Sequence, residues 1–174
     1  MNRIFLIGYM GSGKTTVGQL LAARLGYRFI DMDAYIEETQ FKTVHQIFTE
    51  HGEPEFRLLE QHCLHEIGTF DHVVISTGGG APCFFDNMKF MNEHGVSIYL
   101  KLSPEQLAER LEESQANKRP LLAGRKGEEL LQFIRDGLAI REPFYSQASY
   151  SVTGEIEPTV SRIFDLVETN RQIE

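Results

Sequence analysis

The residues with the clearest chemical signature are the eight from Gly8 to Thr15, which read GYMGSGKT. This order of glycines, lysine and threonine is typical of a phosphate-binding loop, because glycine lets backbone N–H groups approach a polyphosphate closely. Lys14 would place its ammonium group against the outer phosphates, and the Thr15 hydroxyl could ligate Mg²⁺. The alternative is a glycine-rich turn without a ligand, which leaves the lysine and threonine unexplained. We therefore predict that nucleotide phosphates are bound by Gly11, Ser12, Gly13, Lys14, Thr15 and Thr16.

Two carboxylates follow the short apolar segment 27–30. Carboxylates at the carboxyl end of a strand in an open α/β sheet lie in the crevice where ligands bind. Asp31 could serve the shell of a Mg²⁺ ion, directly or through water, and Asp33 is better placed to accept a hydrogen bond from a substrate hydroxyl. Helix capping is the alternative for both residues, because Asp is favoured at helix N-termini.

Three arginines could bind anionic groups. Arg57 lies three residues before Glu60 in a helical pattern, and Arg141 lies in another. Arg119 belongs to the polar segment 112–126, which is too long for an ordinary connection and is predicted to form a mobile lid. Arg119 would then fold over the phosphates and stabilise the charge of the transition state. The alternative for all three is a solvated or ion-paired arginine on the surface, and spacing alone leaves both interpretations open.

The composition limits the class of protein. The chain of 174 residues has 41% apolar and 24% charged residues, which favours a single globular domain over 1–174. The net charge of −8 argues against general nucleic-acid binding. No apolar run approaches membrane-spanning length and no signal-peptide pattern precedes the first strand, so we expect a cytoplasmic protein without a membrane partner. We separately expect a monomer. Cys63 and Cys83 have no zinc-site spacing, and we interpret His62 and His65 as part of a solvated helix face.

Apolar segments alternate with helical patterns along the chain. Strands are expected at 4–7, 27–30, 73–75, 96–102 and 149–153, and the longer helices at 15–25, 52–67, 84–94, 104–111, 128–142 and 158–170. Such alternation predicts a parallel sheet with right-handed crossovers in a three-layer α/β fold. Glycines 78–80 follow the third strand, and their cost in backbone entropy indicates that the backbone approaches a ligand or another segment closely there.

These motifs, taken in order, resemble the shikimate kinase family over nearly the whole chain. The stretches that carry the resemblance are Gly8–Thr16, Asp31-Met32-Asp33, GEPEFRLLE at 52–60, STGGG at 76–80, RPLL at 119–122 and REPFY at 141–145. The resemblance implies a phosphate-loop fold like that of nucleoside monophosphate kinases, with a five-stranded parallel sheet in the order 2-3-1-4-5. It further implies a substrate-binding helical region at about 33–61 and a mobile lid at about 112–126.

The resemblance also implies a reaction, the ATP-dependent phosphorylation of the 3-hydroxyl of shikimate to shikimate 3-phosphate and ADP, a step of aromatic amino acid biosynthesis. It implies catalytic roles for Asp33, Lys14 and Arg119, a Mg²⁺ site at Thr15 and Asp31, and ATP contacts from the phosphate loop and Arg119. Shikimate would be bound by Asp33, Arg57, Gly79, Gly80 and Arg141, with Glu60 orienting Arg57. It further implies an adenine-stacking role for Arg110.

Three alternatives remain to be weighed. Another small-molecule kinase, such as a gluconate or nucleoside monophosphate kinase, shares the phosphate loop but not the triple glycine with GEPEFR. A GTPase switch would need an N-K-x-D motif, whereas Asn117-Lys118 is followed by Arg119-Pro120. A nucleotide-binding scaffold without catalysis is disfavoured because the lysine, the two aspartates and Arg119 are all present.

Overall fold

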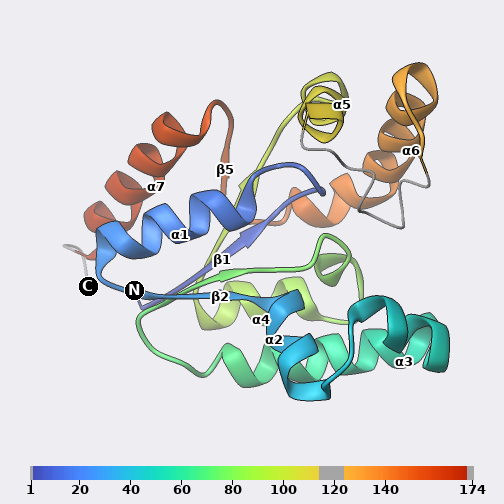
Figure 1. The fold of residues 1–174 in the computed structure, drawn as a ribbon. Coiled ribbons are helices and arrows are strands. Elements are labelled where there is room, and N and C mark those ends of the chain that lie inside the picture. Colours follow the sequence, from blue (N-terminus) through green and yellow to red (C-terminus); the bar gives the residue numbers. More distant parts are fainter. Residues whose placement is uncertain (1, 114–123, 172–174) are drawn as a thin grey trace.

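A computed structural model describes residues 2–113 and 124–171 (Figure 1). Five strands form one parallel sheet in the order β2-β3-β1-β4-β5, as predicted. The strands are β1 (Arg3–Ile7), β2 (Arg28–Asp31), β3 (Val73–Ser76), β4 (Val96–Leu100) and β5 (Tyr150–Val152). Because all five run in the same direction, the segments that follow them meet at one edge of the sheet.

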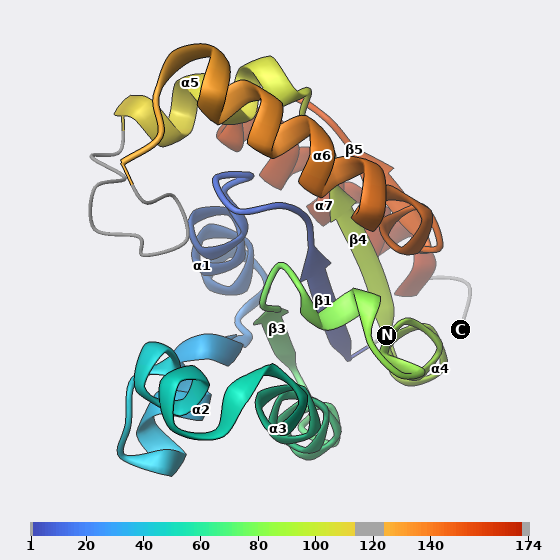
Figure 2. The ribbon, with the colours of Figure 1, turned by 90° about the vertical axis from the view of Figure 1, so that its right-hand side faces the viewer.

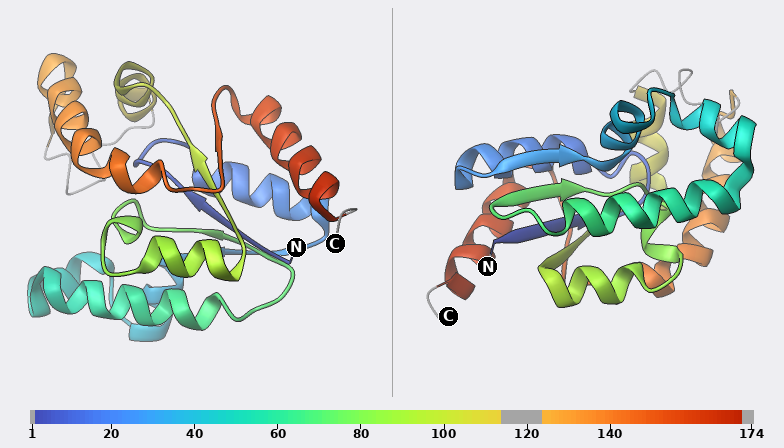
Figure 3. Two further views of the ribbon diagram at one scale, coloured as in Figure 1. Left: turned by 180° about the vertical axis from the view of Figure 1, so that it is seen from behind. Right: turned by 90° about the horizontal axis from the view of Figure 1, so that it is seen from below.

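The central strand β1 divides the core into two layers. Ile4 and Leu6 point to the face covered by α1 (Lys14–Leu25) and α7 (Ile156–Arg171), whereas Phe5 and Ile7 point to the opposite face. All four side chains are fully buried, which explains why the strand reads as a continuous apolar run rather than an alternating one. Helices α3 (Val44–Ile67) and α4 (Asn87–His94) cover that opposite face (Figures 1 and 3). The predicted three-layer α/β fold is confirmed.

Four helices surround the carboxyl end of the sheet. Figure 2 shows α5 (Pro104–Glu113) and α6 (Gly127–Tyr145) on one side of the phosphate loop, and α2 (Met32–Gln40) and α3 on the other. The phosphate loop therefore lies between two helical walls, one from each half of the chain.

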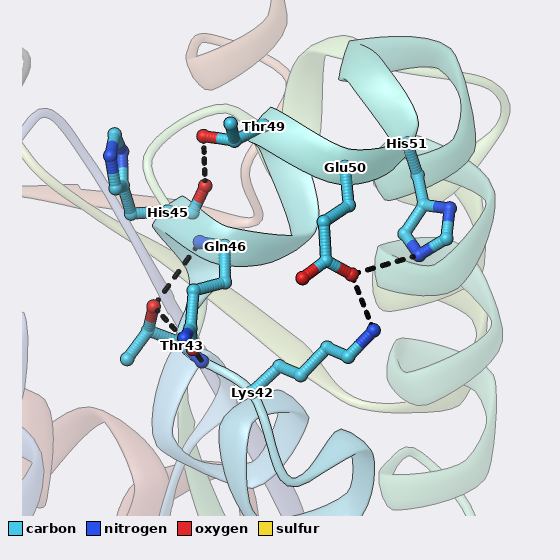
Figure 4. A network of polar contacts seen from close by, with 7 residues as sticks. All are labelled: Lys42, Thr43, His45, Gln46, Thr49, Glu50 and His51. Carbon is cyan, nitrogen blue, oxygen red and sulfur yellow. Dashed lines mark hydrogen bonds and ion pairs between the residues drawn. The ribbon is translucent and has the colours of Figure 1, made fainter.

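The start of α3 is fixed by local polar contacts. Thr43 and Gln46 form a capping box, with Gln46 N donating to Thr43 Oγ1 at 3.2 Å and Thr43 N donating to Gln46 Oε1 at 2.8 Å (Figure 4). Glu50 forms ion-pair contacts with both Lys42 and His51 in the same turn region (Figure 4). The helix is then interrupted at Gly52, whose φ of 79° is positive. The part of α3 before Gly52 is therefore set at an angle to the part that follows it.

Several predicted boundaries differ from the structure by one to three residues, and two of these differences have a clear local cause. The helix predicted over 84–94 begins only at Asn87, after a short 3₁₀ helix at Ala81–Cys83. The reason is local: Phe84 is extended, and Phe85 has a φ of 51°, which no α-helix accommodates. The strand predicted over 96–102 ends at Leu100, because the three residues of β5 pair only with 98–100. Among the described residues, no helix is long and apolar enough to cross a membrane.

Candidate active site

The phosphate loop joins β1 to α1 and directs the helix N-terminus into the site. Gly13 caps α1 with a φ of 92°, a left-handed conformation that favours glycine, and no side chain caps the helix. The first N–H groups of α1 therefore remain available to an anion, which the helix dipole also attracts. Lys14 is held across the loop, because its Nζ donates to the carbonyl oxygens of Gly8 at 2.9 Å and of Tyr9 at 3.1 Å.

Thr15 and Asp31 meet beside the loop. Thr15 Oγ1 donates to Asp31 Oδ2 at 2.9 Å, while Asp31 Oδ1 accepts hydrogen bonds from the N–H groups of Asp33 and Ala34. Asp31 is therefore the N-cap of α2 and a neighbour of Thr15 at the same time, so the two sequence interpretations hold together. Hydroxyl and carboxylate oxygens are ligands that suit Mg²⁺.

Asp33 lies two residues after Asp31, in the first turn of α2. Its pKa is raised, first by lost hydration and second by the negative charge of Asp31, and Glu37 adds to the shift. Lys14 and Arg57 act in the opposite direction without cancelling it. A carboxylate whose ionised form is disfavoured in this way is a better proton acceptor than an ordinary aspartate.

The triple glycine is the floor on which the charged side chains converge. A Cβ atom on Gly78 would lie 2.8 Å from Glu60 Oε1 and 3.0 Å from Asp33 Oδ1. A Cβ on Gly80 would lie 2.7 Å from both terminal nitrogens of Arg57. Glycine is required because the side chains of Asp33, Glu60 and Arg57 occupy the space where a Cβ would stand, so the predicted close approach is found.

Gly79 lies between Arg141 and the phosphate loop. A Cβ at this position would be 3.5 Å from Arg141 Nη1, 3.5 Å from the carbonyl oxygen of Gly8 and 3.7 Å from the N–H nitrogen of Met10. The hydroxyl of Tyr145 donates to the Gly79 carbonyl oxygen. The backbone at Gly79 thus lies close to both Arg141 and the phosphate loop.

Arg57 is held rigidly by α3. Its Nη1 donates to Glu60 Oε2 at 2.8 Å and its Nη2 to Glu53 Oε1 at 2.9 Å, and its guanidinium lies over the Phe84 ring at 4.2 Å. The Arg57 side chain is 12% exposed and that of Glu60 is 1% exposed. Burial raises the pKa of Glu60, and the Arg57 charge opposes this shift. Arg57 therefore has a defined position, unlike the solvated surface arginine that spacing alone also allowed.

Arg141 is held by α6, which is tied to β4. Glu142 accepts a hydrogen bond from Tyr99 Oη at 2.6 Å and one from Lys101 Nζ at 2.5 Å. The guanidinium of Arg141 lies over the ring of Tyr9 at 5.0 Å. The sequence prediction missed Tyr9 and also the Phe84 contact with Arg57. An aromatic residue in the second position of the phosphate loop was visible in the motif, but its partner is distant in sequence.

Some predicted features lie elsewhere. Arg119 falls outside the described residues, as does the predicted lid at 112–126 except for its two ends. Arg110 lies beside the phosphate loop, with Nη1 3.5 Å from the Ser12 carbonyl oxygen and Nη2 3.5 Å from Glu155 Oε2.

An open depression of about 590 Å³ between α5 and α6 is lined by Glu105, Glu109, Glu112 and Glu113. The negative charge of these glutamates would repel phosphates, so the depression does not suit a nucleotide.

Comparison with known proteins decides the family. The family model described as shikimate kinase matches residues 10–169 of the chain. The chain belongs to the shikimate kinase family. It is 54% identical over 166 residues to the shikimate kinase of Parabacteroides distasonis, with 95% of each chain covered. The identification that the sequence motifs indicated is thereby confirmed, and the chain is an ATP-dependent kinase.

Solved shikimate kinase structures share the fold closely. The crystal structure of shikimate kinase from Bacteroides thetaiotaomicron is 49% identical, with a TM-score of 0.91 over 96% of this chain and 98% of that one. Shikimate kinase from Acinetobacter baumannii, in complex with shikimate, is 35% identical, with a TM-score of 0.87 over 98% of this chain and 94% of that one. The chain therefore spans nearly the full length of the shikimate kinases that it resembles.

Proposed function

We propose that the chain transfers the γ-phosphoryl group of ATP to the 3-hydroxyl of shikimate, giving ADP and shikimate 3-phosphate. The observation that carries this proposal is the convergence of Asp33, Arg57 and Arg141 on the glycines at 78–80, directly beside the phosphate loop. A kinase site needs both a polyphosphate cradle and a holder for the accepting hydroxyl within reach of it.

The donor half of the site is the phosphate loop. The N–H groups at the start of α1 and the ammonium of Lys14 would hold the phosphates and offset the charge that spreads over the transferring group. Arg119 adds a second cation from the lid in this proposal, on the strength of the family resemblance alone. Phosphoryl transfer asks the protein for positioning and charge neutralisation rather than covalent chemistry, which fits this set of residues.

Thr15 and Asp31 would hold the Mg²⁺ ion that accompanies ATP. Their oxygens are 2.9 Å apart, and Mg²⁺ commonly takes one or two protein ligands while phosphate oxygens and waters complete its shell. Among the described residues, no group of three or more His, Cys, Asp or Glu side chains is arranged so that it could hold a metal ion, so a cage built by the protein alone is absent there. When bound, the ion would neutralise charge on the β- and γ-phosphates.

The acceptor half of the site would grip shikimate at its carboxylate. Arg57 and Arg141 offer planar guanidinium groups that can bind a carboxylate with two parallel hydrogen bonds, which lysine cannot do. Asp33 would accept a hydrogen bond from the 3-hydroxyl and so direct its oxygen at the γ-phosphorus. Its raised pKa suits a proton acceptor, although a loose transition state needs little early deprotonation. The Gly79 and Gly80 backbone would line the same pocket.

The remaining features of the proposal concern the molecule as a whole. We assign one domain over 1–174, a monomeric state and a cytoplasmic location. The single sheet with one core on each face supports the first of these. Gel filtration with light scattering measures the second, and a mass near 19.9 kDa is expected.

A coupled ADP-release assay tests the function. Shikimate should be phosphorylated with a kcat/KM at least 100-fold above those for gluconate and nucleoside monophosphates, because neither class presents a carboxylate and hydroxyl in the same geometry. Arg57→Lys should lose most of this preference for shikimate. Arg28→Lys is the control and should keep the preference, because Arg28 begins β2 and so lies at the other end of this strand from Asp31 and the site. Equal activity with gluconate, or no effect of Arg57→Lys, would contradict the proposal.

A further inference from the structure

Tyr9 occupies the second position of the phosphate loop, and yet its side chain is buried in the core. The ring is 2% exposed, lies in the core between β1 and α6, and has the Arg141 guanidinium over it at 5.0 Å. Burial raises the pKa of its hydroxyl, and the charge of Arg141 opposes this shift. The Tyr9 backbone, meanwhile, accepts the hydrogen bond from Lys14 Nζ. One residue thus contacts both halves of the site.

We propose that Tyr9 is a positioning residue that fixes Arg141 for the acceptor carboxylate and ties this arginine to the phosphate loop. This inference rests on the proposed function, in which Arg141 binds the carboxylate of shikimate. A cation within about 6 Å of an aromatic centroid is attracted by the ring, and the attraction is stronger where water is excluded. The Tyr9 ring therefore restrains the guanidinium through the face of the ring, a contact that uses none of the N–H donors of Arg141.

The packing of α6 supports this role. A Cβ atom on Gly137, one turn before Arg141, would collide with the Tyr9 hydroxyl and lie 3.0 Å from ring atom Cε2. Glycine at this position therefore lets the helix backbone settle directly on the tyrosine. Since Glu142 also ties α6 to β4, the arginine, the helix and the ring form one packed unit.

Substitution of Tyr9 should affect acceptor binding selectively. Tyr9→Leu removes the ring, and we expect the KM for shikimate to rise about 3- to 10-fold, while the KM for ATP changes less than 2-fold. Tyr9→Phe keeps the ring and should stay within about 2-fold of the parent enzyme. Tyr27→Leu is the matched control, because Tyr27 precedes β2 and so lies at the opposite end of the sheet. It should leave both KM values unchanged.

A suppressor pair keeps the inference testable if Tyr9→Leu folds poorly. Gly137→Ala should raise the KM for shikimate, because the added methyl group displaces the tyrosine or the helix that carries Arg141. Adding Tyr9→Phe removes the hydroxyl that the methyl group meets and should recover at least half of the loss. A purely structural defect in α6 would not be relieved by shortening the tyrosine.

A double-mutant cycle with Arg141→Gln separates this inference from the proposed function. If Tyr9 acts through Arg141, then Tyr9→Leu should raise the shikimate KM in the parent enzyme but less than 2-fold in the Arg141→Gln background. An unchanged KM in Tyr9→Leu, or equal rises for ATP and shikimate, would overturn the role of Tyr9 alone. An unchanged shikimate KM in Arg141→Gln would instead refute the carboxylate role of Arg141 on which the inference rests.

Discussion

Gly80→Ala is the substitution whose effect the structure defines most closely. The new Cβ would lie 2.7 Å from Nη1 and Nη2 of Arg57 and 2.9 Å from its Cζ, whereas ordinary contacts begin at about 3.4 Å. Arg57 must therefore move by roughly 0.7 Å. The guanidinium is the end of a long, flexible side chain, so the fold should tolerate this movement. The guanidinium would, however, leave the position set by its contacts with Glu60 and Phe84. A charge-assisted hydrogen bond contributes about 1.5–3 kcal/mol, so losing one or weakening two should raise the KM for shikimate about 10- to 100-fold.

Steady-state ADP release with each substrate varied in turn, together with thermal unfolding, measures this effect. We expect the ATP KM to change less than 2-fold and the Tm by a few degrees at most. The control is Gly26→Ala, which has no heavy atom within 4 Å of its Cβ but forces alanine into a φ of 68°. It should lower the Tm and leave both KM values unchanged. A normal shikimate KM in folded Gly80→Ala would show that Arg57 is not a shikimate ligand at this position.

Three further substitutions test the roles of single oxygens. Asp33→Asn should reduce kcat by about 100-fold or more. It should also remove the fall of kcat/KM at low pH, whose midpoint in the parent enzyme lies above the ordinary aspartate range because the Asp33 pKa is raised. Near-normal turnover would exclude an essential proton-accepting role. Because a raised carboxyl pKa in the folded state destabilises the protein above the unfolded pKa, Asp33→Asn should also raise the Tm at pH 7, and this gain should vanish as the pH falls below the unfolded value. Thr15→Ala should increase the Mg²⁺ concentration needed for half-maximal activity about 10-fold, with Thr15→Ser restoring it, and an unchanged Mg²⁺ dependence would remove Thr15 from the metal site. Glu60→Gln should raise the shikimate KM about 3- to 10-fold through Arg57, and an equal effect on the ATP KM would point to a general loss of structure instead.

The parts of the site that local sequence determines were predictable. The phosphate loop depends on glycines and a lysine within eight residues, and its strand and helix flank it directly. Asp31 follows its strand, so its place at the carboxyl edge follows from parallel topology. The sheet order itself came from the family resemblance, because strand periodicity does not tell which strands are neighbours.

The contacts that hold the arginines were not predictable, because each joins segments far apart in the chain. Arg141 and Tyr9 meet only once α6 packs on the phosphate loop at Tyr9, and Phe84 reaches Arg57 because the chain turns at Phe85 instead of forming the expected helix. The glycines at 78–80 predicted that the backbone approaches another group closely, but they did not identify that group. Tertiary packing supplied those partners, and no pattern of period 2 or 3.6 encodes them.

The position of the new phosphate ester tests the central claim most directly. The chain is incubated with ATP, Mg²⁺ and shikimate, and the product is examined by ³¹P NMR with correlation to the ring protons. The arrangement of Asp33, Arg57 and Arg141 around the glycine floor predicts a single monoester coupled to the proton at carbon 3, formed in equal amount to ADP. A phosphate on another hydroxyl, or ADP with only inorganic phosphate beside it, would contradict the account.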